Sequence, residues 1–143
     1  MFSTSQITAK IDTDGTPIPL GDLSYFLYLL RALYVAGYKD IPGQGDLTPD
    51  SIDQAHLLAR SIVHNISGNP RRFAAYASEK LSEKEDIRVV DIYRQNPLSI
   101  LLEGIPLLLM ACMIVAGGAF ALNPKAVELP KLRTMIANIR NSI

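Results

Sequence analysis

The sequence predicts an α+β fold: a small antiparallel sheet with three packed helices, followed by a long apolar helix and a C-terminal amphipathic helix. Residues 5–13 and 87–93 have the composition of strands, and the segments between them repeat apolar side chains at helical spacing. Residues 98–122 form an apolar run with a single charge, at Glu103. We therefore expect one small folded domain with an apolar appendage.

Length and composition limit the class of protein. The chain has 143 residues, of which 48% are apolar and 20% charged, enough for one domain with a hydrophobic core. Lys and Arg together equal Asp and Glu at 14 each, so no overall positive field predicts binding to duplex nucleic acid. The single cysteine, Cys112, excludes an intrachain disulfide and favours a reducing compartment. The N-terminus lacks the apolar region of a signal peptide, so we expect this part to stay in the cytosol.

The first strand is predicted at 5–13, where apolar and polar residues alternate. Asp14-Gly15 signals a tight turn, followed by a short returning edge strand at 16–19 that two prolines disfavour. This region is not a calcium loop by sequence, because no series of oxygen ligands and no bidentate Glu follows.

Three helices are predicted next. Residues 21–38 repeat apolar side chains at i, i+3 and i+4, and their tyrosines suit the edge of a core better than a ligand stack. Thr48-Pro49 and Asn69-Pro70 each place an N-cap residue before a proline, so helices should begin there and end at Ser67-Gly68 and near Leu81. The buried stripe of the second helix is predicted to contain Ile52, Ala55, Ala59, Ile62, Val63 and Ile66.

The segment 82–86 reads as a charged turn and leads into the strand at 87–93, which is rich in β-branched residues. This strand is apolar on both faces, which predicts a covered, central position paired with the first strand.

The apolar run is predicted to be one helix that begins at Asn96-Pro97 and ends at Asn123-Pro124. Gly104 to Leu122 is uncharged over 19 residues, close to the length that crosses a bilayer core. A helix apolar on every side must be buried, and the roughly 100 other residues would be strained to enclose it. Membrane insertion is therefore favoured, although Glu103, Pro106 and the lack of a Trp/Tyr belt oppose it, and burial between subunits in water stays open.

Small residues within this run suit close packing between helices and so predict a homo-oligomer. The alternative is that Gly and Ala are common in membrane spans in any case. Lys and Arg number four on each flank, so their count does not decide the orientation in a membrane. The candidates for helix packing or for lining a pore are Glu103, Cys112, Ala116, Gly117, Gly118 and Ala121.

The segment from Leu129 onward places its apolar side chains on one face and its basic side chains elsewhere, which predicts a basic amphipathic helix. Such a helix is typical of a membrane surface or of a partner's groove. The apolar residues of this face are Leu129, Leu132, Met135, Ile136, Ile139 and Ile143.

No motif for catalysis, metal binding or phosphate binding is found, so we expect a non-enzyme without a cofactor. His56 and His64 are eight positions apart on one helix, whereas zinc-binding pairs usually sit at i, i+4. If the protein binds an anion, the candidates by charge are Arg71, Arg72, Arg88 and Arg94. Solvated side chains are the alternative explanation for Arg71 and Arg72.

The order of parts, an apolar run at 98–122 after a strand at 87–93, resembles that of small bacterial membrane effectors of nucleotide-signalled anti-phage defence. The resemblance implies that residues 1–95 are a cytosolic sensing or assembly domain that binds a nucleotide messenger. It also implies that residues 96–122 form an ion-channel-type pore or perturb the inner membrane, with 123–143 as a basic tail. No ligand-binding residue is transferred by the resemblance.

Two further functions remain open from the sequence. One is a soluble, cytoplasmic, oligomeric interaction module whose apolar helix is buried between subunits. The other is a small enzyme within a larger complex, which would be supported if His56 or His64 lay in a pocket with a carboxylate.

Overall fold

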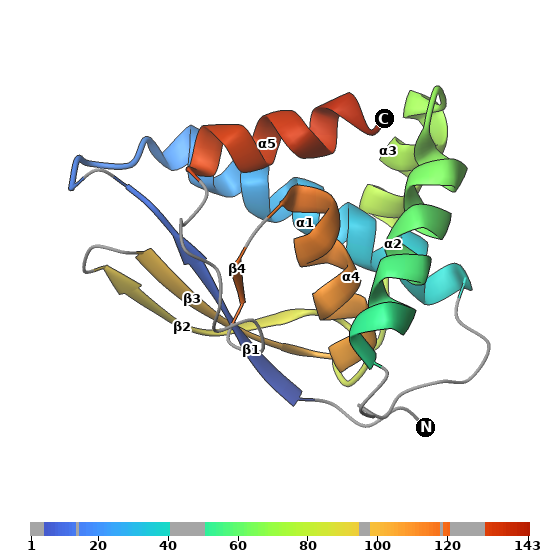
Figure 1. Cartoon of the computed structure of the whole chain (residues 1–143), viewed down its shortest axis with the longest axis horizontal. Coiled ribbons are helices and arrows are strands. Elements are labelled where there is room, and N and C mark those ends of the chain that lie inside the picture. Colours follow the sequence, from blue (N-terminus) through green and yellow to red (C-terminus); the bar gives the residue numbers. More distant parts are fainter. Residues whose placement is uncertain (1–4, 14, 41–50, 95–97, 118, 121–130) are drawn as a thin grey trace.

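The computed structural model describes residues 5–13, 15–40, 51–94, 98–117, 119–120 and 131–143. Within these residues the chain has an α+β fold, as the sequence predicts (Figure 1). The helices are α1 (Leu20–Asp40), α2 (Ser51–Ile66), α3 (Pro70–Ser78), α4 (Pro106–Ala116) and α5 (Leu132–Asn141). The strands are β1 (Ser5–Ile11), β2 (Arg88–Arg94), β3 (Leu98–Gly104) and the two-residue β4 (Ala119–Phe120).

The strands form one antiparallel sheet in the order β2-β3-β1-β4. β3 pairs with β1 along its whole length, from Ser5 opposite Gly104 to Ile11 opposite Leu98. β2 lies on the outer side of β3, and a bulge between Val89 and Asp91 interrupts their pairing. The predicted central position of β2 beside the first strand is therefore wrong, because β3 occupies that place.

The predicted helix over 98–122 is also wrong. Its first part is strand β3, in which Leu98, Ile100 and Leu102 are buried and alternate with partly exposed side chains. Its second part is helix α4, which begins at Pro106 after Ile105 in an extended conformation. A residue before proline is disfavoured in helical conformation, and proline suits the first helical position, so the chain changes from strand to helix there.

No helix in the described part of the chain is long and apolar enough to span a membrane. The apolar helix α4 has 11 residues and is about 16 Å long, roughly half of a hydrocarbon core. The strain expected on enclosing a 19-residue apolar helix does not arise, because α4 has only 11 residues. α1, α2 and α5 together with the sheet surround α4, so the fold buries it within the same chain.

The helices lie on one side of the sheet, and the core fills the space between these layers (Figure 1). β1 contributes Ile7, Ala9 and Ile11 to this core, while Gln6 and Lys10 on its other face are exposed. The described residues of all three predicted segments, 1–95, 96–122 and 123–143, contribute side chains to the same core.

The predicted C-terminal amphipathic helix is confirmed as α5, although Leu129 lies outside the described residues. Leu132, Met135 and Ile139 are buried against α1 and α4. The apolar face of this helix is thus covered by the protein's own core.

Several local predictions are confirmed. β1 and α1 fall where the alternation and the helical spacing predict them. Asn69 caps α3, since its side-chain oxygen accepts a hydrogen bond from the Arg72 N–H at 3.1 Å. The turn after α3 and the burial of Ala55, Ala59, Ile62 and Ile66 in α2 also agree with the sequence.

Other local predictions differ from the structure. No strand forms at 16–19, where the two prolines limit backbone pairing, and α3 ends at Ser78 before the predicted Leu81. Ile52, predicted to be buried in α2, is 44% exposed. The predicted helix boundaries at Thr48-Pro49, Asn96-Pro97 and Asn123-Pro124 lie outside the described residues.

Buried and partly buried hydrogen bonds attach α1 to the end of α3, to the segment before β2 and to Ile105 after β3. The Tyr34 hydroxyl donates to the Glu85 carbonyl at 2.7 Å and accepts from the Ile105 N–H at 2.9 Å. Arg31 donates to the Ala77 and Glu79 carbonyls at 3.0 and 2.6 Å. These bonds fix the start of β2 relative to the helical layer.

Candidate functional site

Three of the four arginines that the sequence nominates for an anionic ligand have described side chains, and these three do not line a common pocket. Arg88 forms an ion pair with Glu103 at 2.6 Å and also donates to the Glu83 carbonyl at 2.9 Å. Arg72 donates to the Asn65 carbonyl at 3.3 Å, while Arg71 is exposed on α3. Arg94 is the last residue of β2, and its side chain lies outside the described residues. Arg71, Arg72 and Arg88 line neither of the two pockets described below.

The residues nominated for helix packing or a pore lie in several environments. Glu103 is on β3, where it pairs with Arg88 and accepts a hydrogen bond from Gln6 at 3.3 Å. Cys112 and Ala116 are fully buried in α4, and burial raises the pKa of the Cys112 thiol. Gly117 ends α4 in the left-handed conformation, with φ at 70°. The other two, Gly118 and Ala121, lie outside the described residues.

The first candidate site is an apolar surface on the edge strand β2. Val89, Val90, Ile92 and Tyr93 are each between 43% and 53% exposed, and we call these four residues the β2 surface. Val89 and Ile92 lie opposite the buried Leu102 and Ile100, whereas Tyr93 lies opposite Ser99 on the other face, so exposed apolar side chains flank this edge on both sides. Exposed apolar side chains gathered along one edge strand are typical of an interaction site.

The β2 surface is exposed because the helical layer does not extend over this edge of the sheet. Val89 and Ile92 lie opposite Leu102 and Ile100, so they point to the side on which the helices pack. α4 contacts β1 and β3, and no comparably extensive contact joins a helix to β2 within the described residues. β2 is thus apolar on both faces although it is an edge strand, so this pattern does not come from a central position in the sheet.

The hydrogen bonds of β2 show which backbone groups face the free edge. The Ile92 N–H donates to Oδ1 of Asp91 at 2.8 Å, so this group points away from β3. A side-chain hydrogen bond with the Asp91 carboxylate raises the pKa of Tyr93, whose side chain lies on the same strand. Within the described residues no strand pairs with this edge of β2, and the Asp91 carboxylate accepts the hydrogen bond of the Ile92 N–H in place of a neighbouring strand.

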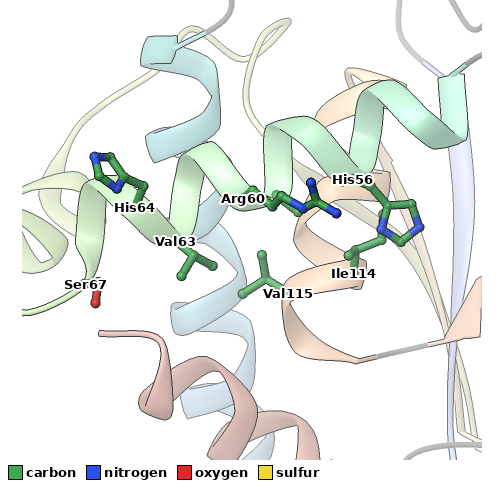
Figure 2. A pocket seen from close by; sticks show the side chains of 8 residues that line it. His56, Arg60, Val63, His64, Ser67, Ile114 and Val115 are labelled. Atoms are coloured by element: carbon green, nitrogen blue, oxygen red, sulfur yellow. The ribbon is translucent and has the colours of Figure 1, made fainter.

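The second candidate site is a groove between α2 and α4, with a volume of about 600 Å³ (Figure 2). Its floor is formed by Ile114 and Val115 of α4, and Val63 lies on its α2 side. Arg60, His56 and His64 lie along α2 at intervals of four residues. We call this hollow the α2–α4 groove.

Both histidines thus lie in a pocket, but no carboxylate is present among the described residues that line it. The arrangement that would support an enzymatic function of His56 or His64, a pocket shared with a carboxylate, is thus present only in part among the described residues. No group of three or more His, Cys, Asp or Glu side chains suited to a metal ion occurs in the described portion.

The second hollow, of about 370 Å³, lies between the end of β1 and the starts of α1 and α5. Its charged residues balance, with Asp12 and Asp22 against Lys131 and Arg133, and Arg133 Nε lies 3.6 Å from the Asp22 carboxylate. Neutralised charges and an exposed position give this hollow no preference for a charged ligand.

The sequence alone could not reveal the groove, because α4 is apolar on every side and Ile114 and Val115 do not differ from their neighbours.

In comparisons with known proteins, no family model, no curated protein and no solved structure matches this chain.

Proposed function

We propose that this protein is a non-enzymatic interaction module that associates with a second copy of itself through the β2 surface. The observation that carries the proposal is the exposed apolar edge strand, which no helix covers extensively in the described residues. Burying apolar side chains is the main favourable contribution to protein association. An edge strand is also self-complementary, since two antiparallel copies related by a two-fold axis present the same groups to each other.

The charges of β2 select one register for this pairing. With Ile92 opposite the same residue of the second copy, Asp91 faces Tyr93, and no like charges oppose each other. With Asp91 at the two-fold axis, two carboxylates would meet directly, which is unfavourable. We therefore place Ile92 at the axis.

The backbone supports the same register. The N–H and C=O of one residue in an antiparallel strand point to the same edge, and the Ile92 N–H points away from β3. Two copies of Ile92 can therefore exchange a pair of N–H···O=C bonds. The carboxylate of Asp91, released from the Ile92 N–H, then remains free to accept from a Tyr93 hydroxyl.

The dimer should be weak and reversible. One strand pair with four apolar side chains on each copy gives an interface at the small end of the range for protein complexes. Dimer formation also replaces the hydrogen bond between the Ile92 N–H and the Asp91 carboxylate, which further reduces the net free energy of association. We expect a dissociation constant in the roughly micromolar range.

Sedimentation velocity over a concentration series of the full chain tests this proposal. The weight-average mass should rise from monomer to dimer, and Ile92→Lys should remain monomeric, because two ammonium groups would meet at the axis. Leu57→Lys is the matched control, since Leu57 is 62% exposed on α2 and lies outside the β2 surface. Circular dichroism should show the same folded spectrum for all three proteins.

The proposal would be wrong if the chain stayed monomeric up to millimolar concentration. It would also be wrong if Leu57→Lys weakened the dimer as much as Ile92→Lys does. In that case the self-association would not involve β2.

The pore-type effector expected from the sequence depended on an uninterrupted apolar helix. A pore built from residues 98–116 would first require β3 to separate from β1 and α4 to leave the core. The interaction module requires no such rearrangement, and for this reason we prefer it.

A further inference from the structure

One side of α4 reaches the surface in the α2–α4 groove. Ile114 and Val115 are partly exposed there, whereas the residues of α4 that precede them are buried. A floor of branched aliphatic side chains in a hollow favours a ligand with an aliphatic body.

One end of the groove is positively charged. Figure 2 shows the guanidinium group of Arg60 extending toward the ring of His56, near Ile114. Within the described residues Arg60 has no ion pair or hydrogen bond, whereas Arg31 and Arg88 are each paired with a carboxylate. A guanidinium group that is unpaired within the described part of the chain, beside an apolar floor, suits bidentate binding of a carboxylate.

The dimensions of the groove limit the length of the ligand. Arg60 and Ser67 are seven residues apart on α2 and its C-terminal turn, a distance of about 10 Å along a helix. The volume of about 600 Å³ lies within the usual range for small-molecule sites. Both values suit an extended aliphatic chain of medium length.

We propose that the α2–α4 groove binds a medium-chain aliphatic carboxylate. The carboxylate lies on Arg60 and His56, and the chain covers Ile114 and Val115 in the direction of Ser67. This site is separate from the β2 surface and does not depend on self-association.

Isothermal titration calorimetry of the full chain with octanoate tests the assignment. Octanol, which lacks the charge, and butyrate, which lacks most of the chain, should each bind more weakly than octanoate. Arg60→Gln should weaken octanoate binding about tenfold, the effect expected when a charge-assisted pair is lost. The matched control is Arg71→Gln, the same change at an exposed arginine of α3, which should leave the affinity unchanged.

Equal affinity of Arg60→Gln and Arg71→Gln for octanoate would overturn the assignment of the carboxylate. Equal affinity of the chain for octanol and octanoate would do the same, and butyrate as tight as octanoate would remove the role of the floor. Binding of an acidic peptide, with none of octanoate at millimolar concentration, would make the groove a protein-docking surface and the proposal wrong. Ile92→Lys should retain octanoate binding, which separates this test from that of the dimer.

Discussion

The buried hydroxyl of Tyr34 offers the sharpest test of the fold. The Tyr34 side chain is fully buried, and its hydroxyl bonds to two backbone groups, the Glu85 carbonyl and the Ile105 N–H. Tyr34→Phe keeps the ring and removes both bonds. A buried polar group left without a partner costs about 1 to 3 kcal/mol, so we expect a loss of about 2 to 4 kcal/mol in the free energy of unfolding.

Urea unfolding followed by far-ultraviolet circular dichroism measures this loss. With a typical dependence on urea of about 2 kcal/mol per molar, the midpoint should fall by roughly 1 to 2 M. Tyr28→Phe is the matched control, because Tyr28 lies on the same helix and is 47% exposed. That variant should stay within about 0.5 kcal/mol of the original protein.

The reasoning would be refuted if the two variants had the same midpoint. Such a result would mean that the Tyr34 hydroxyl does not attach the start of β2 and the end of β3 to α1.

Three further outcomes follow from the structure. Gly104→Ala should destabilise the protein, because the added Cβ would lie 2.9 Å from the Tyr34 hydroxyl; an unchanged urea midpoint would contradict this contact. Gly117→Ala should cost about 1 to 2 kcal/mol, since φ is 70° and the Cβ would lie 2.7 Å from Nδ2 of Asn138; a stability gain in thermal melts would oppose this. Burial raises the pKa of Cys112, so stability present at neutral pH should fall once the pH exceeds the ordinary thiol value of 9.0. Cys112→Ala should flatten this fall, and an unchanged slope of stability against pH would exclude the thiol as its cause.

Local signals in the sequence predicted several elements correctly. Asn69-Pro70 begins α3 because capping depends on neighbouring residues only. The alternation of β1 and the apolar stripe of α5 likewise appear within a few residues of sequence. These patterns identified the elements whose buried face differs from their exposed face.

The candidate sites could not be predicted in the same way. β2 is apolar on both faces, a pattern that fits a covered strand and an exposed interaction edge equally well. The nominated Arg88 has the expected charge, but Glu103 on the neighbouring strand neutralises it. Both outcomes depend on other parts of the sequence: the helices leave β2 uncovered, and Glu103 of β3 pairs with Arg88.

The sequence by itself determined the α+β class, the positions of β1, α1 and α3, and the amphipathic nature of the C-terminal helix. Only the tertiary structure decided how residues 98–116 fold. Leu98, Ile100 and Leu102 alternate with other residues, including Ser99 and Glu103, but so short a pattern also fits the start of an apolar helix, and the pairing of Leu98–Gly104 with β1 makes that part a strand. Pro106 then starts α4, which is enclosed by helices and sheet from distant parts of the chain. An apolar run can be buried either as one long helix or as a strand followed by a helix, so burial alone does not decide between them. The pairing of Leu98–Gly104 with β1, which joins residues far apart in the sequence, decides for the strand.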